Sequence, residues 1–340
     1  MLSKNPIIIL ESANSHGGSK KVFLKLINKF SFLDYSNLHI KFQPFKYDEI
    51  STFDYNWYKV YKKLYFKKSF WNNVIRESSK LYKGIWLDIF DSYGLDILKE
   101  NISKIYGIKI QSSVIQNEKI YNELKNFNNQ KLSLIINISG YNLYEIKNLL
   151  IKYQKLQFKL IILQCGFQSY PTKVSNLNLN KINYLKKKFN LNNISFADHT
   201  DSRDDFSLYF PSVLLSKNCN IIEKHIGLHG NNSKYDGSSS LNFRQSEKFI
   251  DFFKKTLLSL GNNKFISNEE KKYLRSTVQK PVFSKNLPKG KILELDDIEF
   301  KRTNQSLRFV PNIKQKVNKY IITLNVKKND LVKTTCLKKK

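Results

Sequence analysis

Two short polar clusters each follow a short apolar run directly: Asp-His-Thr at 198–200 and Glu-Lys-His at 223–225. Polar, ligand-type residues at the carboxyl ends of successive buried strands are where a parallel α/β barrel assembles an active site. Two imidazoles from neighbouring strands can ligate a divalent cation and leave coordination positions open for a substrate. The placement therefore favours a metal site at His199 and His225 over two separate hydrogen-bonded histidines.

Two lysines at other strand ends could hold an anion. Lys41 alternates with Gln43, and Lys109 alternates with Gln111. An ammonium in a partly desolvated mouth offers three donors and a concentrated charge, which suits a phosphate or a carboxylate. The alternative is chance placement, because 58 basic residues less six arginines leave 52 lysines. We favour the anion site, since both lysines alternate with polar neighbours.

The elements that must position these residues follow from the apolar pattern. Helical stretches separate eight short β-rich runs, an alternation that predicts βα units and a parallel sheet. Eight such units in about 260 residues match a (β/α)₈ TIM barrel, of the α/β class. The predicted strands are residues 6–10, 38–42, 85–90, 105–110, 132–138, 158–163, 193–197 and 220–222.

Helix boundaries support the same division. Asn142 with Glu145 resembles a capping box, and Ser246 with Gly261 brackets a second apolar-periodic stretch. In the seventh strand, the two-residue period predicts that Ser195, Ala197 and His199 all point into the barrel.

The pattern changes twice along the chain. We expect a barrel domain at 1–261, a polar linker at 262–280 and a small β-rich domain at 281–340. Within the barrel, the aromatic-rich stretch 44–83 is the least regular part. We favour ordinary packing for it, with a lid over the site as the alternative.

Composition limits the classes of partner. The formal net charge is +30, but it is nearly all lysine and forms no stripe with interleaved glycines and aromatics, which indicates compositional bias rather than a nucleic-acid site. Three cysteines without CxxC spacing argue against disulfides and fit a reducing cytoplasm. The apolar start is too short for a membrane span. We expect a cytoplasmic protein with no nucleic-acid or membrane partner.

Eight motifs occur in the order seen in the sialic acid (N-acetylneuraminate) synthase family, which this chain resembles. They are Glu11-Ser-Ala-Asn14-Ser-His16-Gly17-Gly18, Lys41-Phe42-Gln43, Phe90-Asp91, Ile108-Lys109-Ile110-Gln111-Ser112, Tyr170-Pro171-Thr172, Asp198-His199-Thr200, Glu223-Lys224-His225 and Asp236. The C-terminal Lys289-Gly290-Lys291 and Phe300-Lys301-Arg302 resemble the family's small antifreeze-like (SAF) domain.

The resemblance implies a synthase that condenses phosphoenolpyruvate with the aldehyde of an N-acylated amino hexose, releasing phosphate and forming a nine-carbon 2-keto sugar acid. It implies that His199 and His225 bind Mn²⁺ or Mg²⁺ and that Glu11 positions or deprotonates a water. Further positions implied to bind substrate are Lys41, Lys109 and Ser112 for phosphoenolpyruvate, Gln43, Tyr170 and Asp236 for the sugar, and Ser139, Gln168 and Asp198 nearby.

The resemblance also implies a domain-swapped homodimer, in which Arg302 of the small domain reaches the partner's barrel mouth. The sugar stays open between N-acetylmannosamine and a bacillosamine-type hexose. Two other functions also stay open: another phosphoenolpyruvate-using aldol-type synthase, and a non-catalytic basic barrel that binds carbohydrate or nucleic acid.

Overall fold

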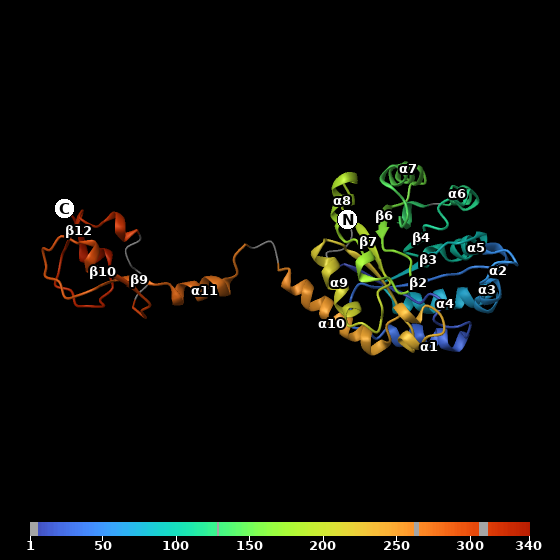
Figure 1. The fold of residues 1–340 in the computed structure, drawn as a ribbon, viewed down its shortest axis with the longest axis horizontal. Helices are drawn as coiled ribbons and strands as arrows, with labels where there is room; N and C mark the ends of the chain where they lie inside the picture. Colours follow the sequence, from blue (N-terminus) through green and yellow to red (C-terminus); the bar gives the residue numbers. More distant parts are fainter. Residues whose placement is uncertain (1–5, 128, 262–264, 306–311) are drawn as a thin grey trace. The chain divides into compact units, whose positions relative to one another are not determined.

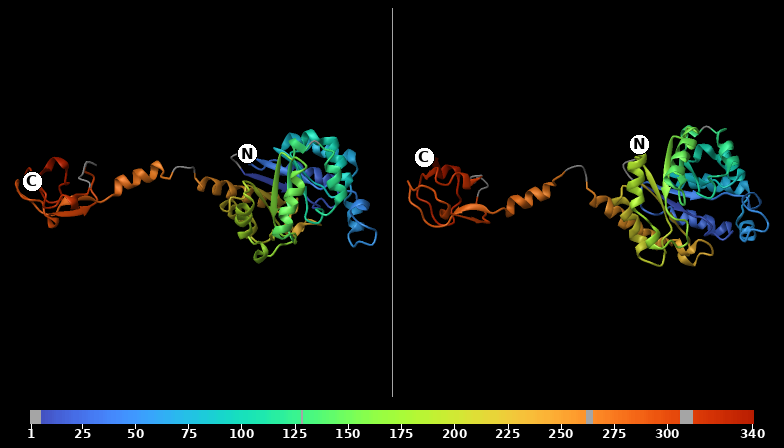
Figure 2. Two further views of the ribbon diagram at one scale, coloured as in Figure 1. Left: turned by 90° about the horizontal axis from the view of Figure 1, so that it is seen from above. Right: turned by 45° about the horizontal axis from the view of Figure 1, so that its top comes forward.

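The computed structural model describes residues 6–127, 129–261, 265–305 and 312–340. The chain divides into two compact units, Met1–Leu260 and Gly261–Lys340. The first unit is a closed barrel of eight parallel strands in sequential order, with helices outside the strands (Figures 1 and 2). This architecture confirms the predicted (β/α)₈ class.

All eight predicted strands are present, with some shifted ends. The largest change is at the last strand, which continues through three polar residues to His225. The strands are β1 Ile7–Glu11, β2 Leu38–Phe42, β3 Gly84–Asp88, β4 Gly107–Ile110, β5 Ser133–Asn137, β6 Leu160–Cys165, β7 Ile194–Asp198 and β8 Ile221–His225.

The helices of the first unit follow the strands in the expected alternation, with three of them between β2 and β3. They are α1 Lys20–Phe30, α2 Tyr47–Ile50, α3 Tyr58–Leu64, α4 Lys68–Leu81, α5 Ser92–Asn101, α6 Glu118–Leu124, α7 Leu143–Gln154, α8 Asn180–Phe189, α9 Phe206–Ser216 and α10 Phe243–Ser259. Among the described residues, no helix is long and apolar enough to cross a lipid bilayer.

One capping prediction holds, and the other holds only at its C-terminal end, where Gly261 follows the C-cap residue of α10 with a φ of 69°. Asn142 and Glu145 form the predicted capping box at the start of α7. Ser246, in contrast, lies inside α10, because Asn242 and Gln245 form a capping box four residues earlier. An asparagine caps a helix as well as a serine does, so an apolar stretch preceded by both leaves the start ambiguous.

Alternate side chains of each strand face opposite ways, as the two-residue period requires. In β7, Ile194 and Phe196 join the apolar layer between strands and helices, whereas Ser195 accepts a hydrogen bond inside the barrel from Gln164. The inward direction predicted for Ser195, Ala197 and His199 is therefore confirmed.

The lower part of the barrel is filled by Trp86, which is fully buried with isoleucines from β1, β5, β6 and β8. Gly107 opposite leaves room for the indole, since a Cβ there would lie 2.4 Å from the ring. The indole N–H donates to Nδ1 of His39 at 3.0 Å, and Nε2 of His39 lies 3.2 Å from Oδ1 of Asn37. These contacts hold His39 as a neutral imidazole beneath the site.

The second unit contains α11 Asn268–Thr277 and two antiparallel strand pairs, β9 Lys280–Phe283 with β10 Ile298–Lys301, and β11 Tyr320–Ile322 with β12 Leu337–Lys339. A separate small apolar core includes Phe283, Leu293 and Ile322. The predicted linker at 262–280 thus contains a helix, and its residues 262–264 lie outside the described residues.

His39 makes the stability of the barrel depend on pH. Burial, with a contribution from Lys83, lowers the pKa of His39 to about 3. Below about pH 6.5 the unfolded chain binds a proton that the folded chain does not, so stability falls as the pH falls toward 3. We expect His39→Gln to remove about 1.4 kcal/mol per pH unit of this dependence, measured by urea unfolding between pH 4.5 and 6.5.

His229→Gln is the matched control, because His229 is exposed. Equal pH slopes for the wild type and the His39 variant would show that His39 is not held neutral by the barrel.

Candidate active site

Five charged side chains meet inside the carboxyl end of the barrel: Glu11 on β1, Lys41 on β2, Asp88 on β3, Lys109 on β4 and Glu223 on β8. None is more than 1% exposed. The strand register places Glu11 beside Lys41 and Asp88 beside Lys109. Acids and bases therefore alternate around four consecutive strands, in an interior where each charge needs a partner.

The ammonium of Lys41 is the centre of this group. Its Nζ lies 2.5 Å from Oε2 of Glu11, 2.9 Å from Oδ2 of Asp88 and 3.0 Å from Oε1 of Glu223. The Nζ of Lys109 lies 2.6 Å from the same Glu223 oxygen. Three carboxylates against two ammoniums leave a formal charge of −3 + 2 = −1, which suits an added cation.

Proximity separates the pKa values of these groups. Burial lowers the pKa of Lys41 to about 8, although Asp88 and Glu223 oppose the effect. Burial also favours the neutral forms of Lys109 and Glu223, but their mutual attraction outweighs it, raising the pKa of Lys109 and lowering that of Glu223. Lys109 and Glu223 are thus a firm ion pair, and Lys41 is the base that loses a proton more readily.

The two predicted metal ligands do converge. The ring centroids of His199 and His225 lie 4.9 Å apart, and ligand atoms of His199, Glu223 and His225 fall within 4.8 Å of one another. Burial lowers the pKa of His199 to about 4 and that of His225 well below its ordinary value, so both rings are neutral at pH 7. Neutral imidazole is the form that binds metal.

The donor set fits a divalent cation. Nδ1 of His199 faces the backbone oxygen of Phe167 at 3.0 Å, and because that oxygen can only accept, Nδ1 carries the proton and Nε2 is left to bind. Nδ1 of His225 is buried without a hydrogen-bond partner among the described residues. The oxygens of Glu223 are engaged by Lys41, Lys109 and Gln164, which makes the two histidines the available ligands.

A chain of amides extends from the charged group to the rim. Asp88 Oδ2 accepts hydrogen bonds from Nε2 of Gln43 and of Gln111, both at 2.9 Å. Gln168 Nε2 donates to Gln111 Oε1 at 3.0 Å, and the hydroxyl of Ser112 donates to Gln168 Oε1 at 3.1 Å. Three residues predicted to bind substrate, Gln43, Ser112 and Gln168, thus join one network through Asp88 and Gln111.

A cavity of about 500 Å³ opens at the barrel mouth, with His225 in its lining. Its polar side includes Asn14, Gln43 and Asp236, and the backbone N–H of Asn14 donates to Asp236 Oδ2 at 3.0 Å. Burial raises the pKa of Asp236. Tyr170 also lines this cavity, with its ring centroid 4.7 Å from that of His199 and 5.5 Å from that of His225.

The opposite side of the cavity is aromatic and comes from the irregular stretch after β2. Phe45, Tyr55, Trp57 and Tyr61 line it, together with Phe90 and Val114. Later residues of the same stretch, including Phe66, Phe70 and Trp71, belong to the buried core. The stretch is therefore a cavity wall in its first half and packing in its second half.

Three predicted site residues lie apart from this convergence. Asp198 points to the other side of β7, where Oδ2 lies 2.7 Å from Nζ of Lys224, in a buried ion pair between adjacent strands. Ser139 commits its hydroxyl to the backbone oxygen of Gly166. Arg302 is exposed on the second unit.

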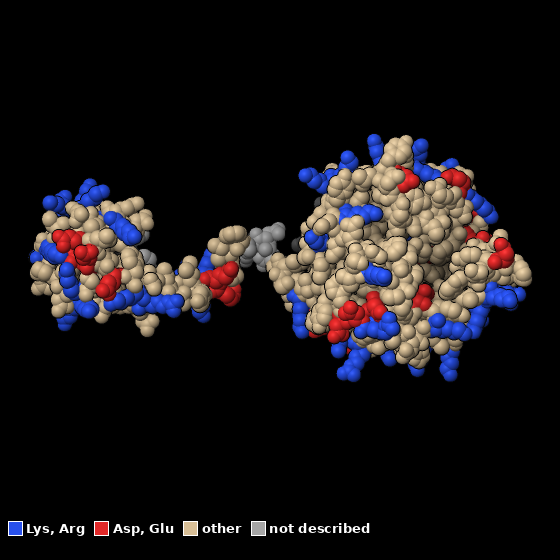
Figure 3. All heavy atoms as spheres, viewed as in Figure 1, with Lys and Arg blue, Asp and Glu red and all other residues tan. Residues whose placement is uncertain are grey.

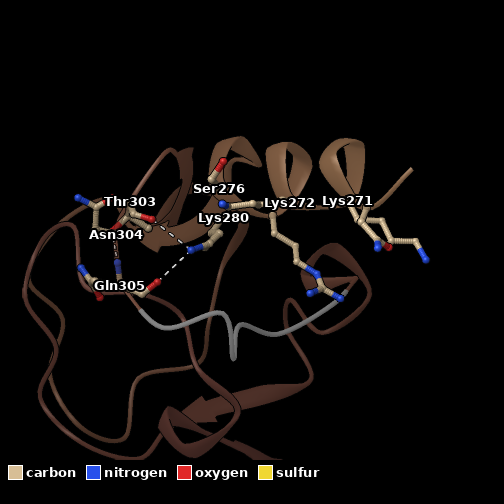
Figure 4. A pocket seen from close by; sticks show the side chains of 9 residues that line it. Lys271, Lys272, Ser276, Lys280, Thr303, Asn304 and Gln305 are labelled. Carbon is tan, nitrogen blue, oxygen red and sulfur yellow. Dashed lines mark hydrogen bonds between the residues drawn. The ribbon is translucent and has the colours of Figure 1, made fainter. Parts of the chain in front are cut away.

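The second unit has a cavity of its own, of about 650 Å³, whose lining includes Lys272 and Lys280. Figure 4 shows the Nζ of Lys280 donating to the backbone oxygens of Thr303 at 3.1 Å and Gln305 at 2.9 Å. Lysines and arginines are dispersed over the visible face of both units (Figure 3). Because none of the converging residues lies in that cavity, the barrel mouth is the candidate active site.

The sequence places Asp88, Gln111, Gln164 and Glu223 at strand ends, but it predicted no role for them in the site. Asp88 and Glu223 pair with the two lysines. Gln111 donates a hydrogen bond to Asp88, and Gln164 donates one to Glu223. The aromatic residues after β2 line one side of the cavity. The two-residue period of β3 and β8 was the available signal, since it turns Asp88 and Glu223 inward with Trp86 and His225. No comparable period marks the aromatic wall.

A protein-family model and individual proteins both match this chain. The NeuB family model matches residues 35–265. Over 148 residues the chain is 28% identical to a pseudaminic acid synthase from Campylobacter jejuni, covering 44% of this chain and 41% of that protein. The match therefore spans well under two thirds of that relative's length.

Solved structures share the fold. A spore coat polysaccharide biosynthesis protein E from Chromobacterium violaceum superposes with a TM-score of 0.77 at 19% identity, over 98% of this chain and 100% of that chain. An N-acetylneuraminic acid synthetase from Leptospira borgpetersenii gives 0.66 at 22% identity, over 80% of this chain and 92% of that chain.

Glu223 contacts both ammoniums of the charged group, those of Lys41 and Lys109. In Glu223→Gln the ammonium of Lys109 loses the carboxylate that lies 2.6 Å from it and meets an amide instead. Removing one partner of a buried ion pair costs about 3 kcal/mol. We expect a loss of that order in the free energy of urea unfolding, measured with chelator present.

Glu118→Gln is the matched control. Glu118 pairs with Lys152 at the surface, so the same change there should cost less than about 1 kcal/mol. Equal effects at the two positions would mean that the buried pair adds nothing.

Proposed function

Because the chain belongs to the NeuB family, we propose that its barrel condenses phosphoenolpyruvate with the aldehyde of an N-acylated amino hexose, releasing phosphate and forming a nonulosonic acid. The observation that carries the proposal is the convergence of His199 and His225, as neutral imidazoles, beside the lysines of a closed charged group. That arrangement offers a cation site and an anion site within one barrel mouth.

The anion end would hold phosphoenolpyruvate. Its phosphate and carboxylate would accept hydrogen bonds from Lys41 and Lys109. These lysines are paired with Glu11, Asp88 and Glu223 in the structure. Ser112, Gln168 and Ser139 would bind the same molecule from the rim, and Asp198 would support it indirectly by fixing Lys224 and the end of β7. With a divalent cation added, the formal charge changes from −1 to +1, which favours an anionic substrate.

The cation end would hold Mn²⁺ or Mg²⁺ on His199 and His225. When bound, the metal supplies a Lewis acid for the sugar aldehyde oxygen, where negative charge develops. The protein's own part is orientation: the backbone oxygen of Phe167 fixes the ring of His199, and Tyr170 packs against both rings.

The reaction balances with one water. C3 of phosphoenolpyruvate forms a bond to the aldehyde carbon, whose oxygen takes up a proton. Water then adds to C2, and the C2–phosphate linkage breaks to leave the 2-keto group and inorganic phosphate. Glu11 would orient this water and accept a proton from it. The Glu11 carboxylate is held in place by an ion pair with Lys41 and by a hydrogen bond of 2.7 Å from the backbone N–H of Ala13.

The sugar would occupy the cavity between the polar and aromatic sides. Gln43, Tyr170 and Asp236 offer hydrogen bonds to hydroxyl or amide groups, whereas the wall of Tyr55, Trp57 and Tyr61 offers apolar surface. Acyl and deoxy groups suit such a wall better than hydroxymethyl groups do. We therefore favour an acylated, partly deoxygenated hexose over N-acetylmannosamine.

We also propose that the segment 281–340 is an antifreeze-like domain and that Arg302 completes the sugar site of a partner subunit in a domain-swapped homodimer. The supporting observations are its separate apolar core and the exposure of Arg302. A cytoplasmic location belongs to the same proposal, and the three free, buried cysteines are compatible with it.

Phosphate release tests the proposed reaction. With phosphoenolpyruvate, Mn²⁺ and a panel of N-acylated hexoses, we expect release that depends on both sugar and metal. His199→Ala and His225→Ala should each lower kcat/KM by about a hundredfold or more, and lower Mn²⁺ affinity measured by calorimetry, because each removes a ligand.

His229→Ala is the control for histidine loss. Release with aldose phosphates but with no N-acylated hexose would replace the proposal with another synthase, and activity that needs neither histidine nor metal would refute it.

Mixing two inactive variants tests the swapped dimer. His199→Ala damages the barrel and Arg302→Ala damages the small domain, so a mixed dimer would contain one intact composite site. After subunit exchange we expect about a quarter of wild-type activity from an equal mixture. Activity no higher than that of the separate variants would show that Arg302 acts within its own chain or not at all.

A further inference from the structure

Asp91, in the Phe90-Asp91 motif, has no role in the chemistry described above, yet its carboxylate is only 4% exposed. It is the N-cap of α5, where Oδ1 accepts from the backbone N–H of Gly94 at 2.7 Å. Its other oxygen, Oδ2, accepts from the backbone N–H of Lys46, also at 2.7 Å. One carboxylate thus joins the loop after β2 to the helix after β3.

Two further contacts hold the same segments together. Glu49 Oε2 accepts from the backbone N–H of Tyr93 at 3.2 Å. Gly94 allows the backbone oxygen of Pro44 to come close, since a Cβ there would lie 3.0 Å from it. The backbone from 44 to 49 therefore lies directly against the first turn of α5.

The joined segment begins the aromatic wall of the sugar cavity. Phe45, next to Lys46, packs edge-on against Phe90 with ring centroids 6.4 Å apart, and against Tyr61 at 5.4 Å. Phe45, Glu49 and Tyr61 all line the cavity. A shift of the Lys46 backbone would therefore move the wall while leaving Lys41, Lys109 and the histidines on their strands.

We propose that Asp91 is a positioning residue for acceptor binding, which sets the aromatic wall of residues 45–61 against the barrel mouth by holding the Lys46 amide and the α5 amide at once. The inference rests on the proposed function for what the wall binds. A carboxylate is needed because it has two oxygens for two N–H groups, whereas an amide has one oxygen and would face the other N–H with a donor.

Burial works against this carboxylate. It raises the pKa of Asp91 to about 7, although the backbone N–H groups of Lys46 and Gly94 oppose the effect. Replacing the acid with a neutral amide removes that cost of burial, and asparagine is as good an N-cap as aspartate. Asp91→Asn should therefore fold, with α5 capped and the contact to Lys46 lost.

Kinetics and hydrogen exchange test the proposal. In Asp91→Asn we expect KM for the best N-acylated hexose of the panel to rise about tenfold, with KM for phosphoenolpyruvate and Mn²⁺ affinity within about twofold of wild type. The Lys46 amide should exchange about tenfold faster in the ligand-free protein. Asp96→Asn, on the exposed side of α5, makes the same chemical change and should alter none of these values.

A hexose KM within twofold of wild type would overturn the proposal, as would equal rises in both substrate constants, which indicate general damage. If Asp91→Asn does not fold, Asp91→Ser replaces it, because a serine hydroxyl can cap the helix but cannot also reach Lys46. Failure of the proposed function is distinguishable: wild-type protein would release no phosphate with any sugar, whereas failure of the inference leaves wild-type activity intact.

Discussion

The shared ammonium of Lys41 is the contact on which the rest of the site depends. It lies within 3.0 Å of carboxylates from β1, β3 and β8. Lys41 on β2 is therefore linked to both neighbouring strands and, through the barrel interior, to β8. Leaving any of these groups unpaired in a buried interior would cost several kcal/mol, and therefore the strands must close in one register. That register also brings Glu11 beside His225, where the proposed anion and cation sites would meet.

The same group explains how a buried charged layer can serve a charged substrate. A pair of lysines saturated by acids is stable without ligand, and an incoming phosphate or carboxylate offers the lysines equivalent acceptors. The displaced acids then need new partners, which a divalent cation and a bound water can supply. Under the proposed function, substrate and metal binding would be coupled, because each would compensate the charge that the other leaves.

Sequence patterns predicted the barrel well because its strands have apolar cores and its inward residues follow a strict period. They failed where polar residues continue a strand. The end of β8 was missed because Glu223, Lys224 and His225 resemble a loop. Each is nevertheless buried beside a partner: Glu223 pairs with Lys109, Lys224 pairs with Asp198, and His225 packs against His199. Asp198 shows a second reason for error. It was predicted to bind substrate with His199, but His199 faces the site whereas Asp198 faces Lys224. Motif membership therefore did not predict which way a residue points; strand alternation did.

The two ends of the site also differ in how they are built. The charged end is built on strands, whose hydrogen-bonded register fixes the position of each side chain. Its residues there are Lys41, Lys109, Glu223 and His225. The aromatic wall stands on short helices and turns, whose position follows from a few side-chain contacts such as those of Asp91 and Glu49. A barrel of this design can keep one chemistry while its acceptor changes, because substitutions in residues 45–61 alter the cavity without disturbing the charged group. In the proposed reaction, the strand motifs would therefore specify the sugar least, and the loop after β2 would specify it most.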